Sequence, residues 1–211
     1  MNKKVSKRNE NKMKNRELII ATAEKLILQK NFEDTSMDDV AKESGLTKRT
    51  IYKHFISKED LFFAVTVEVT KKFISYSEEA IKDGKNALDK IRLSNKAYCQ
   101  FYFDNPGMFR LMNYQPDNMH NCEASPSRHE LMSLKDMSIR KYADIIEEGK
   151  TDGSINSKLD TKKSVYFSMF ASMGLLNLVS NMDQQFFWEG QEVDETEFLN
   201  FSMDLFTDAL T

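Results

Sequence analysis

Residues 35–61 read TSMDDVAKESGLTKRTIYKHFISKEDL and predict two short helices joined by a tight turn. The first helix follows a Thr-Ser pair that can cap it, and it carries Asp38 and Asp39 in its first turn. Acidic side chains are favourable there because they oppose the helix dipole. Gly45 ends this helix, since glycine adopts a positive φ without steric cost. We expect the second helix over residues 47–54.

The spacing of small and branched residues in this stretch is typical of a helix-turn-helix. Ala41 lets a second helix cross closely, and Gly45 follows four residues later at the turn. Ile51 comes six residues after the glycine and points back into the angle between the helices. Leu46 and Phe55 also turn inward. An Ala-x-x-x-Gly spacing is common, so this pattern alone leaves a purely structural helical hairpin open.

The outward face of the second helix is basic. It consists of Thr47, Lys48, Arg49, Tyr52 and Lys53, which include three cations and no acid. The N-terminus of the helix adds a partial positive charge and free N–H groups, which suit a phosphate. Lys58 stands at the start of the next helix, also where a phosphate would be held. These features favour a helix-turn-helix that binds nucleic acid.

Three parts of the stretch closely resemble the DNA-binding domain of TetR/AcrR-type regulators. They are residues 35–45, 47–55 and 57–61, and their most specific feature is the spacing of Tyr52, Phe55, Lys58 and Leu61. The detailed match covers about residues 16–63. The resemblance implies an all-α fold. An N-terminal three-helix helix-turn-helix domain would be joined through a long fourth helix to a larger helical domain for ligand binding and dimerisation.

The resemblance also implies roles in DNA binding. Contacts to backbone phosphates are implied for Thr35, Tyr52, His54 and Lys58. The recognition helix would begin with Thr47 and Lys48, and base edges would be faced by Arg49, Thr50 and Lys53. Arg49 stands where many members have a small residue, and it could pair with guanine O6 and N7. A further phosphate contact stays open for Arg49. Ile56 stands where many members have proline, which we interpret as a tolerated loop change.

The 211 residues divide into three predicted segments. Residues 1–16 hold seven basic residues and one acid, and we expect a disordered basic arm, with or without a role. The helix-turn-helix domain is expected over residues 17–62, and the ligand-binding and dimerisation domain over 63–211. Residues 1–60 carry 14 Lys and Arg against 10 Asp and Glu, whereas the rest carries 16 against 23. A basic front on an acidic body indicates that the front meets a polyanion.

Hydrophobic periodicity predicts the remaining helices, and no stretch favours a strand. The helices are expected over residues 17–29, from 57 through 73, and over 87–103, 108–113, 128–148, 159–182 and 194–210. Residues 164–182 carry no charge, and their length is close to that of a membrane span. Their serines and asparagines favour a buried helix instead.

A homodimer is expected because two recognition helices would read a palindromic operator. Ser164, Ser168 and Ser172 recur every four residues and form a narrow strip where helices can approach. The predicted interface consists of Ser168, Ser172, Leu175, Leu176, Val179, Phe198, Phe201 and Leu205. Ordinary packing within one subunit is the alternative.

A pocket for a small apolar or amphipathic effector is expected in the same domain. Its predicted lining is large, soft and aromatic: Phe101, Phe103, Phe109, Met112, Tyr142, Phe167, Phe170 and Met173. For each of these residues, core packing is the alternative to ligand contact. An effector would act through unequal affinity for two states of the protein.

Other classes of protein find little support in the sequence. The two cysteines, Cys99 and Cys122, make no disulfide framework and favour a reducing, cytoplasmic compartment. His120, Cys122 and His129 have a spacing that fits no closed metal site. No phosphate-binding loop, Gly-x-Ser-x-Gly or His-Glu-x-x-His motif occurs, so we expect no enzyme and no cofactor.

The sequence therefore predicts a ligand-responsive transcriptional regulator, a repressor that binds double-stranded DNA as a homodimer and is released by a small effector. Activation instead of repression stays open. The alternative from another class is a helical small-molecule-binding or scaffolding protein whose helix-turn-helix no longer reads DNA.

Overall fold

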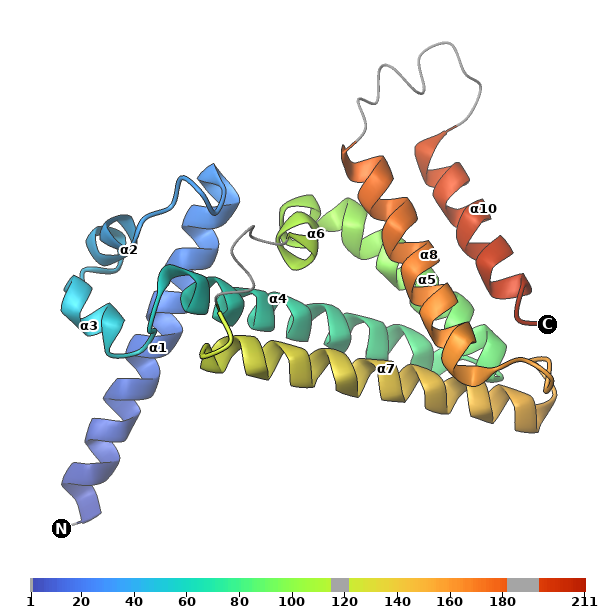
Figure 1. Cartoon of the computed structure of the whole chain (residues 1–211), viewed down its shortest axis with the longest axis horizontal. Helices are drawn as coiled ribbons and strands as arrows, with labels where there is room; N and C mark the ends of the chain where they lie inside the picture. Colours follow the sequence, from blue (N-terminus) through green and yellow to red (C-terminus); the bar gives the residue numbers. More distant parts are fainter. Residues whose placement is uncertain (1, 115–121, 182–193) are drawn as a thin grey trace. The chain divides into compact units, whose positions relative to one another are not determined.

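The computed structural model describes residues 2–114, 122–181 and 194–211, and every regular element within them is helical (Figure 1). The all-α prediction is confirmed. The chain forms two compact units. The N-terminal unit comprises Met1–Val69 and Tyr114–Ser133, and the C-terminal unit comprises Thr70–Asn113 and Leu134–Thr211.

The N-terminal unit is built on α1 (Asn2–Lys30), α2 (Met37–Ser44), α3 (Lys48–Tyr52) and the first parts of α4 (Lys58–Ala80) and α7 (Pro126–Asp152). The helix α2 begins with a capping box, in which the Asp39 backbone N–H donates to Ser36 Oγ and the Ser36 backbone N–H donates to the Asp39 carboxylate. Its C-cap, Gly45, has a φ of 68°. The predicted caps and turn are therefore present.

The core of this unit comes from the predicted apolar stripe of α1 and from the helix-turn-helix. Ile19, Ala23 and Ile27 of α1 are buried, and α1 packs against α2. Val40 and Ile51 are also buried. Because these side chains leave water together, their burial fixes the angle between the helices of the unit.

The disordered arm predicted for residues 1–16 is wrong from residue 2 onward, because α1 begins at Asn2 and spans 29 residues. The physical reason is that the arm has no glycine or proline and is rich in lysine and arginine, which are good helix formers. It directly precedes a helix whose core packing supplies a nucleus, and extension from an existing helix avoids the cost of nucleation.

The boundary between the units also differs from the one expected at residue 63. The segment Tyr114–Ser133 belongs to the N-terminal unit, although it follows α5 and α6 in the sequence. Side-chain hydrogen bonds to the first turn of α4 hold the start of α7 there. Contacts of this sequence separation leave no periodic signal, which explains the missed assignment.

The C-terminal unit adds η1 (Ile81–Asp83), α5 (Ala87–Asp104), α6 (Pro106–Asn113), α8 (Thr161–Asn181) and α10 (Glu195–Asp208) to the later parts of α4 and α7. Pro106 does break the chain as expected, and it then serves as the first residue of α6, where its missing N–H costs nothing. A buried hydrogen bond from Asn95 Nδ2 to Thr207 Oγ1, 3.0 Å long, links α5 to α10.

Two hydrophobic clusters fill the C-terminal unit. One comprises Cys99, Tyr102, Phe109, Leu176, Val179, Leu199 and Met203, and the other comprises Ile91, Ile146, Ile155, Val165 and Leu210. α8 contributes to both, which agrees with the expectation of a buried helix. Within the described residues, no helix combines the length and the apolar character that crossing a bilayer requires.

Candidate nucleic-acid interface

The turn between α2 and α3 holds the two helices in a fixed relation. The Leu46 backbone N–H donates to the Ala41 carbonyl oxygen at 3.2 Å, and the Gly45 N–H donates to the Lys42 carbonyl oxygen at 3.4 Å. A Cβ built on Gly45 would meet no atom within 4 Å. The glycine is therefore needed for its backbone conformation, not for space.

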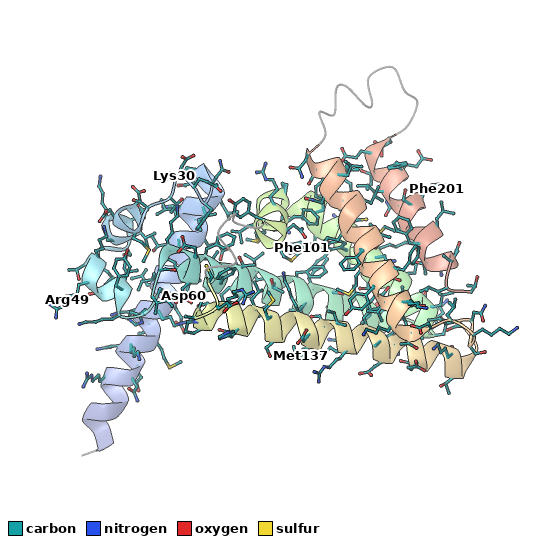
Figure 2. The ribbon with its side chains drawn as sticks, viewed as in Figure 1. Lys30, Arg49, Asp60, Phe101, Met137 and Phe201 are labelled. Carbon is teal, nitrogen blue, oxygen red and sulfur yellow. The ribbon has the colours of Figure 1, made fainter. Side chains whose placement is uncertain are left out.

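α3 presents its polar side chains outward, as the sequence predicts. Thr47, Lys48, Arg49 and Lys53 are exposed, and Tyr52 is 47% exposed. Ile51 and Phe55 are almost completely buried, and Leu46 is partly buried. These apolar side chains attach α3 to the core of the N-terminal unit. Arg49 points away from the rest of the N-terminal unit in Figure 2. The result is an exposed basic surface on a rigid support.

Local caps fix where α3 begins. Thr47 is the N-cap, and its side chain accepts a hydrogen bond from the Thr50 backbone N–H at 3.2 Å. The two threonine hydroxyl oxygens lie 2.8 Å apart. Regular helix ends at Tyr52, two residues before the predicted end, although the backbone N–H groups of Lys53 and His54 still bond to the preceding turn.

Lys48 forms an ion pair that sequence reasoning missed. Its Nζ lies 2.8 Å from Asp38 Oδ2 on α2, and this hydrogen bond raises the pKa of Lys48 above its ordinary value. Both side chains are about half exposed or more, so the pair contributes little to stability. It does supply an acid beside α3, because the turn brings Asp38 back toward a lysine ten residues later.

Thr35 does not lie where its predicted phosphate contact requires. Its side chain is 3% exposed, and its hydroxyl donates to the Asn31 carbonyl oxygen at 2.7 Å. Thr35 therefore satisfies a carbonyl at the end of α1, which is a correction to the prediction. Asn31 has a φ of 69°, and such an end leaves carbonyls that need partners.

The Lys58 ammonium group already has partners inside the N-terminal unit. Its Nζ donates to the Glu33 carbonyl oxygen at 2.9 Å and lies 4.2 Å from the centre of the Phe32 ring. An ammonium has three donors, so two remain for another acceptor. A phosphate contact by Lys58 stays a prediction.

His54 lies partly buried after α3 in a positive environment. Burial lowers its pKa below the usual value, and the charges of Lys12, Arg16 and Lys53 lower it further. The imidazole is therefore neutral at neutral pH, and it could donate a single hydrogen bond to a phosphate. The nearness of Lys12 and Arg16 shows that the basic half of α1 passes close to the end of α3 (Figure 1).

Asp60 is a structural residue of this region whose contacts sequence reasoning missed. Its carboxylate is buried and accepts three hydrogen bonds: from Ser125 Oγ at 2.7 Å, from the Ser127 backbone N–H at 3.0 Å and from the Ile56 backbone N–H at 3.1 Å. Figure 2 labels Asp60 at the start of α4. The sequence does signal a cap at Ser57, to which the Asp60 N–H donates, but not the distant serines.

The predicted pocket residues do not share one lining. Phe101 and Phe109 are buried, and Phe103, Met112 and Tyr142 are half-buried. Phe167, Phe170 and Met173 are instead exposed, and Phe170 is exposed by 60%. The assignment of these three to an interior cavity is therefore wrong. α8 turns its small serines inward, where α8 packs closely on its neighbours, and this orientation directs its aromatic side chains to the surface.

The same rotation of α8 corrects the predicted dimer interface. Ser168, Ser172, Leu176 and Val179 are buried within the chain's own core, and Leu175 and Phe198 are half-buried. Phe201 and Leu205 on α10 are exposed, and Figure 2 labels Phe201. Five of the exposed apolar residues of the two helices are here called the α8–α10 face: Phe167, Phe170, Leu178, Phe201 and Leu205.

Buried hydroxyls without partners lie among these helices. Tyr142 OH, Ser168 Oγ and Ser172 Oγ have no partner at hydrogen-bond distance and angle within the described part of the chain. Burial raises the pKa of Tyr142 to about 12, and the nearby Ser168 hydroxyl offsets part of this rise. A buried polar atom without a hydrogen bond destabilises the folded protein. Binding of a ligand or water that supplied the missing hydrogen bonds would therefore be favoured.

Of His120, Cys122 and His129, which lie close together in the sequence, His120 is outside the described residues. Among the residues that the structure describes, no group of three or more His, Cys, Asp or Glu side chains could hold a metal ion.

These features define a helix-turn-helix domain joined in one chain to a second helical unit. Residues 19–65 match the family model "Bacterial regulatory proteins, tetR family". An HTH-type transcriptional regulator from Staphylococcus aureus (strain bovine RF122 / ET3-1) is 32% identical over 93 residues, 44% of this chain and 50% of the relative. Another, from strain USA300, is 30% identical over 96 residues, 46% of this chain and 52% of the relative. The chain thus spans about half the length of the curated relatives it matches.

Solved structures share the fold over nearly the whole chain. The fatty acid degradation regulator FadR from Bacillus halodurans has a TM-score of 0.69 at 15% identity, covering 92% of this chain and 99% of that one. FadR from Bacillus subtilis, solved in complex with stearoyl-CoA, has a TM-score of 0.67 at 19% identity, covering 92% and 98%. The N-terminal domain is thus similar to the DNA-binding domain of tetR-family regulatory proteins, and the fold of the chain is similar to that of these solved structures.

Proposed function

We propose that this protein is a ligand-responsive transcriptional repressor, which binds a palindromic operator as a homodimer and is released by a small apolar or amphipathic effector. DNA binding is assigned to the N-terminal unit, and effector binding and dimerisation to the C-terminal unit. The observation that carries the proposal is the exposed basic surface of α3, held from below by buried Ile51 and Phe55.

DNA contact by α3 follows from the chemistry of that surface. Arg49 is exposed and its planar guanidinium can donate two parallel hydrogen bonds to guanine O6 and N7. Thr50 and Lys53 lie on the same short segment and would reach neighbouring base edges. Thr47, Lys48, Tyr52 and His54 would hold phosphates on either side, with Lys58 adding a contact through its remaining donors. Ala41, Gly45 and Leu46 would hold α3 in position against α2.

Dimerisation is proposed through the α8–α10 face. Large apolar side chains rarely gather on the surface of a monomeric protein unless they meet a partner. Phe201 is 60% exposed and Leu205 is 52% exposed on α10, and Phe167 on α8 stacks edge-on against Phe206. A two-fold axis through this face would pair it with itself and would give the symmetry that a palindromic operator requires.

Effector binding is proposed around the buried hydroxyls of Tyr142, Ser168 and Ser172. Their polar atoms lack partners in the described residues, and Tyr142 packs against the apolar cluster that contains Ile146 and Val165. Such a mixture suits an amphipathic molecule that brings its own polar group. The stearoyl-CoA complex of the Bacillus subtilis neighbour is one example of an amphipathic ligand in this fold.

The proposal is tested by selecting genomic fragments with the purified full chain, with and without a panel of candidate effectors that includes acyl-CoA thioesters. We expect enrichment of fragments that share an inverted repeat, and at least one compound should release them. Absence of enrichment at low salt would favour the alternative, a helical small-molecule-binding or scaffolding protein.

The basic surface of α3 argues against that alternative, because a helix-turn-helix that no longer reads DNA has no reason to keep exposed Arg49 and Lys53. A cytoplasmic, non-enzymatic role is part of the same proposal, in agreement with the transcriptional regulators that the chain matches over 93 and 96 residues. Repression is proposed over activation, and a reporter gene placed behind a recovered operator would separate the two.

A further inference from the structure

The first half of α1 carries a regular row of basic residues. Arg8, Lys12 and Arg16 recur every four residues, and residues at this spacing lie on the same side of a helix. We call this row the α1 basic stripe. Four residues further along is Ile20, which is buried. The stripe therefore continues the side of α1 that packs into the N-terminal unit, beyond the point where the core ends.

The α1 basic stripe lies close to the residues that follow α3. The Arg16 guanidinium carbon lies 5.4 Å from the centre of the Phe55 ring, and Phe55 directly follows His54. The charges of Lys12 and Arg16 both reach His54, as does the charge of Lys53. Lys53 and the two cations of α1 thus place positive charge around the neutral His54 imidazole.

The stripe has the dimensions of a backbone contact. Arg8 and Arg16 are separated by eight residues, about 12 Å along a helix axis. Duplex DNA carries one phosphate per roughly 3.4 Å of each strand, so this length passes several phosphates. Arg8 and Lys12 are exposed and Arg16 is half exposed. Arg16 also lies 3.9 Å from Glu130, a long and exposed pair that an anion could replace.

We propose that the α1 basic stripe binds the phosphate backbone of the duplex just outside the bases that α3 reads, so that each subunit needs DNA flanking its half-site. This inference rests on the proposed DNA-binding function and names a further surface for it. Phosphate is the occupant favoured by charge complementarity and by the nearness of the stripe to His54.

The test compares two variants of the full chain that remove the same charge from opposite sides of one helix. Lys12→Ala alters the stripe, whereas Lys14→Ala lies about 200° further around the helix and is also exposed. Alanine is a strong helix former, so neither change should shorten α1, and circular dichroism checks this. Lys12→Arg is a third variant that keeps the charge and should behave as the wild type.

Each variant is titrated from 50 to 200 mM salt against two duplexes bearing the same selected site. One duplex ends at the site, and the other extends 8–10 base pairs beyond each end. Raising the salt from 50 to 200 mM weakens binding to the extended duplex. For Lys12→Ala this loss of affinity should be smaller than for the wild type by a factor of about 3.5 per subunit, because one phosphate contact is gone. Lys14→Ala should match the wild type. On the trimmed duplex all variants should coincide.

Equal behaviour of Lys12→Ala and Lys14→Ala on the extended duplex would overturn the inference, and so would an equal loss on both duplexes. In either case, binding by the wild type would leave the proposed function standing. If the wild type bound neither duplex at 50 mM salt, the proposed function would fail and the inference with it.

Discussion

Asp60 at the start of α4 and Ser125 just before α7 are 65 residues apart in the sequence and are joined by a hydrogen bond of 2.7 Å. Ser125 Oγ donates to the Asp60 carboxylate and also accepts from the Arg128 backbone N–H, so it caps α7. One buried carboxylate thereby fixes the beginnings of α4 and α7, next to the end of the helix-turn-helix. These two helices contribute residues to both units.

Replacing this carboxylate should loosen both helix starts. In Asp60→Asn, one of the two acceptor oxygens becomes an amide donor, which leaves the Ile56 or Ser127 N–H without a partner. An unsatisfied buried donor costs about 1–3 kcal/mol in the free energy of unfolding, measured by urea titration. Ser125→Ala removes a cap and one donor and should cost about 1 kcal/mol. An Asp60→Asn variant with an unchanged free energy of unfolding would contradict the role assigned to this carboxylate.

Gly45 should be restricted by its backbone alone. Gly45→Ala forces an L-residue to a φ of 68°, which costs about 1–2 kcal/mol of stability, although no neighbour lies within 4 Å of its Cβ. Gly45→Asn should recover most of the loss, because asparagine tolerates this region. Gly153, with a φ of 80° and an equally open surrounding, is the matched control. Gly153→Ala should lower thermal stability similarly and leave DNA binding intact, whereas equal losses of DNA binding would argue against the role of the turn.

Arg49 should read a base. Arg49→Ala should cost about 1–3 kcal/mol on the selected site and relax base preference at one position per half-site. Arg49→Lys keeps the charge but cannot form the bidentate pair, so it should also lose the preference. Binding isotherms on selected and scrambled duplexes measure both effects. A uniform loss on every sequence would make Arg49 a phosphate contact instead.

Lys58 should act differently from Arg49. Lys58→Ala should weaken binding to all sequences alike and reduce the salt slope by about 1. It should also lower the free energy of unfolding, because its Nζ lies over Phe32 and bonds to the Glu33 carbonyl. A loss of stability with an unchanged salt slope would assign Lys58 a structural role only.

The α8–α10 face should govern association. Phe201→Glu places a charge in the centre of the proposed interface and should weaken dimerisation by roughly 30-fold, about 2 kcal/mol. The monomer should stay folded because Phe201 is largely exposed. Met137→Glu, an exposed apolar position on α7 that Figure 2 labels, is the control and should leave the dimer unchanged. Sedimentation velocity over a concentration series distinguishes the variants, and an unaltered Phe201→Glu dimer would move the interface elsewhere.

Local chemistry explains which parts of the fold could be predicted. Ser36, Gly45 and Thr47 act on neighbours within a few residues, so their caps and turn are visible in the sequence. The exposed and buried sides of α3 follow from Ile51 and Phe55, whose burial leaves the cations outside. The start of α6 at Pro106 is predictable to within two residues for the same reason, because proline restricts its own neighbours.

Features that depend on distant partners could not be predicted in this way. Ser168 and Ser172 allow close packing against either the same chain or a second copy, and the sequence does not distinguish these cases. Thr35 has a suitable side chain for a phosphate, but its burial depends on how α1 ends. Asp60 bonds to Ser125, which lies 65 residues away in the sequence.

The Asp38–Lys48 pair has a consequence for how DNA would arrive at α3. Because a carboxylate already neutralises this ammonium, an approaching duplex meets a site where one anion has to displace another. A strand that offers only its charge gains little from such an exchange, whereas one that also satisfies Arg49 recovers the difference. The protein's own acid would therefore act as an internal competitor, and it would lower residence on arbitrary DNA more than on the intended sequence.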